Sequence, residues 1–321
     1  MAERTGATPG AVAQGPRATA FLAVVLAAAL WGTSGVLRSG LALELPAPTV
    51  VAYEHLLLAA FTLPWLAGAL RTFVTLPARA RIAIVLIGVG SSALATTLFT
   101  LAFTFGDPTT PLLLQKLQPI IAVLGAAVLL GERPTPRFLP LAAVALVGAY
   151  LISFPEPFAV AVERLAPALL ALAAASLWAA GTVFGRSVAP QLSTMHLTTL
   201  RFAIGLPAAM VFALARLGPA GLAVRVADVP PLIALALGPG LLAIALYYRG
   251  LARTPASLAT FGELAFPFTA VLLGWLVVGQ RLVVSQWVGL GLLLTAITAL
   301  TLAGRRRPLV RTVGAPVPAR G

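Results

Sequence analysis

Five ionisable residues interrupt stretches of sequence that are otherwise apolar: Glu54, His55, Lys116, Arg201 and Glu263. A charge at the centre of a lipid-spanning helix costs about 2.5–3.5 kcal/mol on insertion scales, so such a group faces a cavity or a partner. Acids and bases in this set can pair as static salt bridges that fix helix packing. Alternatively, they can bind a polar substrate and exchange protons with it.

The elements that carry these residues are apolar throughout. The chain is 60% hydrophobic and 10% charged, whereas a soluble domain averages about 45–50% apolar and about 25% charged residues. Each run is long enough to cross a bilayer as a helix. The sequence therefore predicts an all-α membrane protein with ten transmembrane helices, near residues 18–37, 48–70, 82–105, 109–131, 138–154, 166–185, 194–215, 231–252, 256–279 and 283–303.

Composition and motifs exclude several classes of function. The net charge of +13 lies in short connections and tails, where it sets membrane orientation and does not indicate nucleic-acid binding. The chain has no Cys, two His and nine acidic residues, which argues against a metal cage. No Walker loop and no nucleophile motif is present, so we expect no cofactor and no enzymatic activity.

The distribution of basic residues predicts the orientation. With the N-terminus inside, most Lys and Arg residues of the connections and tails lie on the inner side, and fewer lie outside: Arg38, Arg164, Arg216, Arg225 and Arg281. We therefore expect an inner-membrane protein with both termini in the cytoplasm. Residues 1–17 are predicted to be a disordered N-terminus, and residues 304–321 a basic, mobile tail.

In this orientation the ionisable residues form two layers. Glu54, beside His55, and Lys116 lie about 10 Å below the outer ends of their helices, at ~1.5 Å per residue. Arg201 and Glu263 lie at a similar depth above the inner ends. Each layer is thus predicted to hold one acid–base pair. Adjacent helix positions point about 100° apart and rarely face one cavity, which favours a packing role for His55.

The two halves of the chain resemble each other. LWGTSGVLRSG at 30–40 matches LWAAGTVFGRS at 177–187, and QKLQPIIAVLGAAVLLGER at 115–133 matches ELAFPFTAVLLGWLVVGQR at 263–281. Each half carries five predicted helices, so the second half would enter the membrane upside down. Residues 18–154 and 166–303 are therefore predicted to be inverted repeats, an architecture typical of secondary transporters. A duplicated membrane protein that does not transport is the alternative.

These segments also carry a family resemblance. The Trp31-Gly32 pair, Pro119 followed by LLGER at 129–133, and YYRGLARTPAS at 247–257 are similar to the drug/metabolite transporter superfamily, and within it to the EamA-type transporters. The resemblance covers about residues 18–303. It implies a fold of ten helices in two inverted repeats, and usually export of amino acids, other metabolites or drugs.

Other residues are expected to shape the cavity. Pro119 and Pro267 would bend their helices and free the carbonyls of Gln115 and Glu263, which favours both helices as cavity walls. The other candidate residues are chosen because they lie deep within a predicted helix or because their side chains are polar. Trp31 and Trp178 can stack on a substrate or fill space, Tyr248 can donate a hydrogen bond, Gly32 and Gly181 permit close packing, and Glu132 is expected to pair with Arg133 or Arg137.

The sequence therefore predicts a proton-coupled exporter of small metabolites that works by alternating access. Loss of solvent penalises a carboxylate, so Glu54 or Glu263 would bind the driving proton when its layer closes. The expected partners are a small-molecule substrate, protons and lipid, with the chain acting as a monomer or a homodimer. The alternatives are an uncoupled exchanger and a lipid-modifying membrane enzyme using Glu54 and His55.

Overall fold

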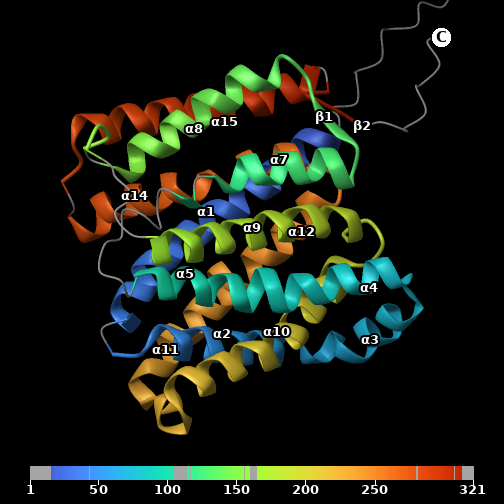
Figure 1. Cartoon of the computed structure of the whole chain (residues 1–321), viewed down its shortest axis with the longest axis vertical. Coiled ribbons are helices and arrows are strands. Elements are labelled where there is room, and N and C mark those ends of the chain that lie inside the picture. Colours follow the sequence, from blue (N-terminus) through green and yellow to red (C-terminus); the bar gives the residue numbers. More distant parts are fainter. Residues whose placement is uncertain are drawn as a thin grey trace, which may run out of the picture.

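A computed structural model describes residues 16–42, 44–103, 114–115, 117–154, 156–159, 165–279, 281–306 and 308–312. These residues form a bundle of helices that run side by side across the molecule (Figure 1). The elements of the first half are α1 (Pro16–Ala42), α2 (Ala47–Thr62), η1 (Leu63–Trp65), α3 (Leu66–Thr75), α4 (Ala78–Val85), η2 (Leu86–Leu94), α5 (Ala95–Phe103), α7 (Gln118–Leu129), β1 (Glu132–Pro134) and α8 (Phe138–Ser153).

The second half has a similar order of long helices, but its strand follows the last helix. It consists of α9 (Leu165–Val188), α10 (Thr194–Leu217), η3 (Pro219–Leu222), η4 (Val226–Asp228), α11 (Val229–Leu235), η5 (Ala236–Leu242), α12 (Ala243–Leu251), α13 (Ala256–Gly262), α14 (Ala265–Val278), α15 (Val284–Arg306) and β2 (Val310–Thr312). Helix α1 packs against α12 and α14, and α9 packs in the same way against α5 and α7. Helices α8 and α15 pair with each other along one edge (Figure 1).

Within the described residues, seven helical segments are long and apolar enough to cross a membrane. They span Ala47–Thr75, Ala78–Phe99, Leu165–Val188, Thr194–Leu217, Val226–Leu251, Ala256–Val277 and Val284–Ala303. Three shorter apolar helices cover Ala18–Ser34, Gln118–Leu129 and Phe138–Ser153.

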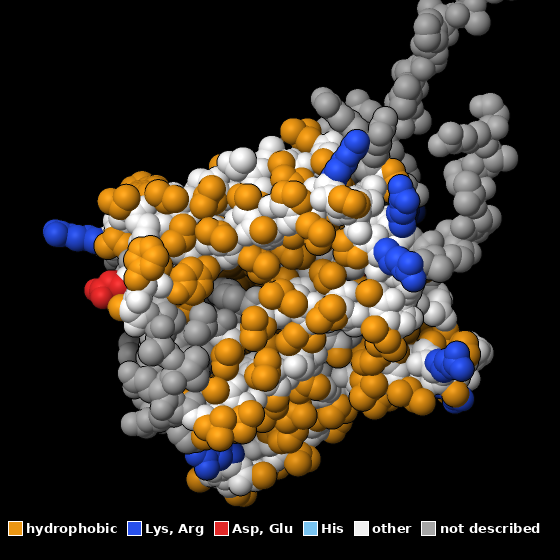
Figure 2. All heavy atoms as spheres, turned by 45° about the horizontal axis from the view of Figure 1, so that its top comes forward, with side chains coloured by type: hydrophobic (Ala, Val, Ile, Leu, Met, Phe, Trp, Pro, Cys, Tyr) orange, Lys and Arg blue, Asp and Glu red, His pale blue; other side chains and the backbone are white. Residues whose placement is uncertain are grey.

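The outer surface of the bundle is suited to lipid. Large hydrophobic side chains are exposed on several helices, among them Val128 at 82%, Leu276 at 61% and Leu294 at 55%. Figure 2 shows hydrophobic side chains over the middle of one face, with Lys and Arg toward its edges. An apolar belt between charged margins is the arrangement that a bilayer stabilises.

Three helices are irregular where they pass the interior. Segments η2 and η5 are π-helical, and they occupy corresponding places in the two halves. Between α13 and α14 the helix is interrupted at Glu263 and Leu264. Single π turns and helix breaks place backbone and side chains where a regular helix cannot, and they are frequent at functional sites.

A short ribbon departs from the purely helical prediction. Strand β1 pairs antiparallel with β2, with Glu132 opposite Thr312 and Pro134 opposite Val310. The tail was expected to be mobile from about residue 304, but α15 continues to Arg306 and β2 ties residues 310–312 to the first half. Helix α1 likewise begins at Pro16, inside the segment predicted to be disordered. The rest of both tails lies outside the described residues.

Candidate functional site

A cavity of about 460 Å³ lies inside the bundle, between the irregular helices. Nine of the residues predicted to form the site line it: Trp31, Glu54, His55, Gln115, Pro119, Trp178, Arg201, Glu263 and Pro267. Of the other two, Lys116 lies outside the described residues. Tyr248 does not line the cavity, because its side chain is 1% exposed and packs in the hydrophobic core.

The lining is built from corresponding positions of the two halves. Many of its residues fall into pairs whose numbers differ by 147 or 148. These pairs include Trp31 and Trp178, Ser34 and Gly181, Glu54 and Arg201, His55 and Phe202, Ser91 and Pro239, Phe99 and Tyr247, Gln115 and Glu263, and Pro119 and Pro267. The cavity therefore lies where equivalent surfaces of the repeats face each other.

Glu263 accepts three hydrogen bonds in the cavity wall. Its Oε1 accepts hydrogen bonds from Tyr247 Oη at 2.7 Å and Thr182 Oγ1 at 2.9 Å. Its Oε2 accepts one from Gln118 Nε2 at 2.9 Å. The donors come from three helices, α12, α9 and α7, so this carboxylate joins both halves of the chain.

The two prolines interrupt their helices rather than bending them. Pro119 lies in the first turn of α7 and Pro267 in the first turn of α14, where a missing N–H costs nothing. The prediction that Pro267 leaves the Glu263 carbonyl free is wrong, because that oxygen accepts the Phe266 N–H at 3.0 Å. The break itself turns the Glu263 side chain toward the cavity.

Glu54 and His55 both line the cavity, although they are neighbours on α2. The His55 ring is 5% exposed, with Nδ1 2.9 Å from the Val51 carbonyl oxygen and Nε2 2.9 Å from Ser92 Oγ. A carbonyl oxygen can only accept, so Nδ1 carries a proton, and in the neutral ring Nε2 accepts from the Ser92 hydroxyl. The ring edge meets Phe202. His55 is thus held in place by both halves.

Arg201 does not form the predicted acid–base pair with Glu263, since no ion pair joins these two described side chains. Its Nη1 donates to Tyr248 Oη at 3.0 Å instead. The buried Nε has no hydrogen-bond partner among the described residues. Tyr248 therefore positions Arg201, while Tyr247 contacts Glu263 and the cavity. The sequence pointed to the wrong one of two adjacent tyrosines, whose side chains leave the helix about 100° apart.

Two aromatic pairs, also related by the repeat, form part of the lining. Trp31 contacts Tyr247 with ring centroids 5.1 Å apart, and Trp178 contacts Phe99 at the same separation. Gly32 and Gly181 support this packing. A Cβ at Gly32 would lie 2.7 Å from the Phe266 carbonyl oxygen, and one at Gly181 would collide with Ser91.

Several cavity residues escaped the sequence-based prediction. Ser91, Ser92 and Thr182 line the cavity, and Tyr247 joins them. A serine or threonine satisfies its hydroxyl on its own helix backbone, so it stands out little in an apolar run. The consecutive Ser91 and Ser92 in the middle of a predicted helix are the feature that could have indicated them.

The ribbon of β1 and β2 lies at one end of the bundle, which we call the ribbon end (Figure 1). Glu132 is 3% exposed and accepts hydrogen bonds at 2.9 Å from the backbone N–H groups of Ala256 and Ser257 and from Ser257 Oγ. The predicted pairing with Arg133 or Arg137 is therefore wrong. A carboxylate from β1 instead caps the N-terminus of α13, where N–H groups that lack a partner within the helix favour a negative charge.

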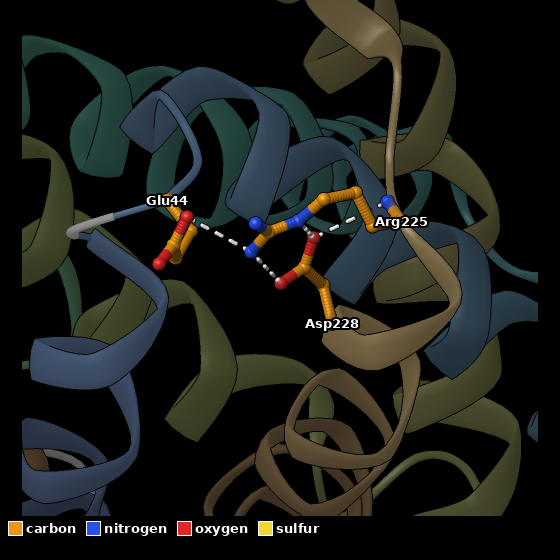
Figure 3. Close-up of polar contacts among 3 residues, drawn as sticks. All are labelled: Glu44, Arg225 and Asp228. Carbon is orange, nitrogen blue, oxygen red and sulfur yellow. Dashed lines mark hydrogen bonds and ion pairs between the residues drawn. The ribbon is translucent and has the colours of Figure 1, made fainter.

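The opposite end carries an ion cluster, which we call the clamp end (Figure 3). Arg225 Nη2 lies 2.9 Å from both Glu44 Oε2 and Asp228 Oδ1. The hydrogen bonds to Asp228, followed by the charges of Asp228 and Glu44, raise the pKa of Arg225, so this residue keeps its charge. Nearby, Thr49 Oγ1 donates to the Gly221 carbonyl at 2.6 Å and Tyr53 Oη to the Leu222 carbonyl at 2.8 Å.

Comparison with known proteins agrees with this architecture. Residues 18–154 and 165–302 each match the EamA-like transporter family. The riboflavin transporter ImpX of Fusobacterium nucleatum is 30% identical over 271 residues, covering 81% of this chain and 90% of its own. A riboflavin transporter of Rhizobium johnstonii is 33% identical over 189 residues, covering 56% and 57%.

A solved structure described only as "Crystal structure of protein" has the same fold, with a TM-score of 0.72 and 21% identity over 91% of this chain and all of its own. The apolar helices and the family match identify a multi-pass membrane protein, and the names of the relatives indicate a transporter rather than an enzyme. The resemblance inferred from the sequence is thereby confirmed: the chain belongs to the EamA-like transporter family.

Proposed function

We propose that this chain is a secondary transporter that carries a flat heteroaromatic molecule of the riboflavin type through the cavity by alternating access. The observation that carries the proposal is the pair of aromatic contacts in the lining, Trp31 with Tyr247 and Trp178 with Phe99. Aromatic faces stack on a planar ring system. The names of the two relatives point to the same substrate class.

The chemistry of riboflavin suits the rest of the lining. The molecule combines a flat three-ring system, which has carbonyl and imide edges, with an uncharged polyol chain. Amides and hydroxyls of the cavity, such as Gln115, Ser34 and Ser92, can pair with those groups. The volume of about 460 Å³ falls within the ~300–1,000 Å³ common for small-molecule pockets.

Alternating access follows from the proposed arrangement of the repeats. Ten membrane-crossing segments, five in each inverted repeat, would place equivalent residues on both sides of one central cavity. Exchange of conformation between the repeats would then open the cavity to each side in turn. Both termini are proposed to face the cytoplasm, as the basic connections favour.

Glu263 is the proposed proton carrier. Three donors from both halves hold its carboxylate in the cavity wall, so gaining or losing a proton would change contacts between the repeats. Glu54, on the other side of the cavity, is the second candidate. Uncoupled exchange is the alternative, and it predicts no dependence on a pH gradient.

Transport by purified protein in proteoliposomes tests the function. Labelled riboflavin should enter or leave vesicles saturably and be displaced by excess unlabelled riboflavin. A Trp31→Ala, Trp178→Ala double variant should lose about tenfold or more in affinity, since base–aromatic stacking is worth ~1–3 kcal/mol per ring. Phe158→Ala, fully exposed at 102%, is the matched control and should keep wild-type affinity. Absence of saturable riboflavin binding in wild type would reject the substrate class.

Proton coupling is tested separately. Under an imposed pH gradient, Glu263→Gln should abolish accumulation of substrate while riboflavin exchange at equal pH continues. Glu54→Gln should be measured beside it, because either carboxylate can carry the proton. An unchanged pH dependence in both variants would reject proton coupling and favour the uncoupled exchanger. Formation of a modified product from labelled lipid would favour the enzyme.

A further inference from the structure

A second cavity, of about 670 Å³, lies outside the transport path at the ribbon end. It is lined by β2, by residues 135–137 between β1 and α8, and by the end of α15 with the residues that follow it. Its lining includes two guanidinium groups, from Arg137 and Arg311. Because the spanning helices end at this level, the cavity lies at the depth of the lipid headgroups rather than of the hydrocarbon.

The ribbon brings a further positive charge to the same place. In the strand register Arg133 lies directly opposite Arg311, and both residues are exposed. Opposed residues of an antiparallel pair project to one face, and like charges in that position destabilise the pairing. An anion between the guanidinium groups would remove this penalty.

No acidic side chain of the described residues neutralises this cluster. Glu132 neighbours Arg133, but side chains alternate along a strand, and the Glu132 carboxylate points inward to α13. Both ion pairs between described residues are formed by Arg225 at the clamp end. Arg137 and Arg311 line the cavity and Arg133 is exposed beside Arg311, and none of the three forms an ion pair with a described residue.

The remaining lining supplies a hydroxyl and an apolar wall. Thr135 Oγ1 is buried without a hydrogen-bond partner among the described residues, while the Thr135 N–H is used by the Leu309 carbonyl at 2.8 Å. Leu302, which is 51% exposed, and Leu309 form the apolar part. Guanidinium groups, a free hydroxyl and an adjoining apolar surface are the chemistry that holds a phosphate with an acyl chain beside it.

We propose that this cavity binds the phosphate group of an anionic phospholipid. Arg137 and Arg311 would hold the phosphate, Arg133 would add charge from the opposite strand, and the acyl chains would follow the exposed faces of α8 and α15. The bound lipid would thereby lock β2 against β1, which joins the end of the second repeat to the first. This proposal depends on the ribbon and does not require riboflavin to be the transported substrate.

Binding of fluorescent phosphatidylglycerol to the purified full chain in detergent tests the site, with fluorescent phosphatidylcholine as the neutral lipid. The wild type should prefer phosphatidylglycerol by about tenfold or more, and the Arg137→Gln, Arg311→Gln double variant should lose that preference. The matched control is Arg79→Gln, Arg81→Gln, which removes two exposed charges from α4 and should retain the preference.

The outcomes separate the possible ligands. Displacement of phosphatidylglycerol by millimolar inorganic phosphate would support a site for phosphate alone, and failure of phosphate to compete would support a site that needs the lipid. An equal loss of affinity in both double variants would overturn the proposal, because it would indicate general attraction to charge. A wild type that does not distinguish the two lipids would also overturn it.

A second variant tests the cross-strand repulsion directly. Arg133→Gln should raise the melting temperature of lipid-free protein, because it removes a like-charge pair, and this gain should disappear when phosphatidylglycerol is added. The same change in melting temperature with and without the lipid would contradict a ligand between the strands. Transport need not be measured in any of these experiments, so their failure leaves the proposed function standing.

Discussion

At the ribbon end the halves meet through a carboxylate that is 3% exposed, whereas at the clamp end they meet through an ion pair whose Arg225 and Glu44 side chains are 59% and 50% exposed. Glu132 accepts three hydrogen bonds away from water. Because Arg225 and Glu44 are both exposed, water can replace the contact between their side chains. A buried charge is costly to leave unpaired, while an exposed pair contributes about 0–1 kcal/mol.

This difference indicates that the two ends do not open with equal ease. Separating β1 from α13 would leave a buried carboxylate and two backbone N–H groups without partners. Among the polar contacts of the described residues, separating the clamp end breaks one exposed ion pair and the two hydrogen bonds donated by Thr49 and Tyr53. It also separates the apolar contacts of Leu41, Leu45 and Val50 with Leu232 and Leu235. We therefore expect the clamp end to be the easier gate, and changes at the ribbon end to affect folding first.

The largest effect is expected at Glu132. Glu132→Ala should lower the free energy of unfolding by about 3 kcal/mol, because it leaves the Ala256 and Ser257 N–H groups buried without acceptors. Glu132→Gln keeps one acceptor oxygen and should cost about half as much. Thermal unfolding in detergent measures both. Glu156→Ala, an exposed control, should change stability by less than about 0.5 kcal/mol.

An intermediate effect is expected from the neutral contacts of the clamp end. Tyr53→Phe and Thr49→Val each remove a hydrogen bond to a backbone carbonyl of η3, and each should cost about 1 kcal/mol. Thr75→Val removes an exposed local bond within α3 and serves as the control. If Tyr53→Phe destabilised the protein as much as Glu132→Ala, the proposed difference between the ends would be lost.

The smallest effect on stability is expected from the ion pair. Arg225→Gln should lower the melting temperature only slightly at low salt, and the difference should disappear near 1 M salt, where the Debye length is about 3 Å. Arg216→Gln, an exposed arginine in the last turn of α10, is the control. A cost that does not depend on salt would show that the contact is shielded from solvent.

Much of the helical framework could be predicted because lipid makes the sequence pattern simple. The apolar run at 138–154 corresponds to α8 at Phe138–Ser153, and the run at 194–215 to α10 at Thr194–Leu217. Ionisable residues within such runs correctly indicated the cavity, because a charged side chain that faced lipid would be too costly. Glu54, Arg201 and Glu263 all line it.

The features that the sequence did not reveal depend on contacts between distant segments. The ribbon pairs residues 132–134 with 310–312, and neither segment is long enough to be recognised as a strand. Glu132 was expected beside Arg133 or Arg137 because only near neighbours can be judged from spacing, but its partner helix begins at Ala256. Which of Tyr247 and Tyr248 faces the cavity depends on the rotation of α12 about its axis. The helical periodicity of the sequence does not determine this rotation.

Distances across the two ends test alternating access most directly. The chain has no Cys, so spin labels can be placed uniquely at Pro46→Cys with Val226→Cys at the clamp end, and at Ala78→Cys with Gln191→Cys at the ribbon end. These four positions are exposed. On adding riboflavin or changing pH, we predict that one pair moves apart while the other closes. Two distances that stay fixed, or that change in the same direction, would contradict a cavity opened alternately by two repeats.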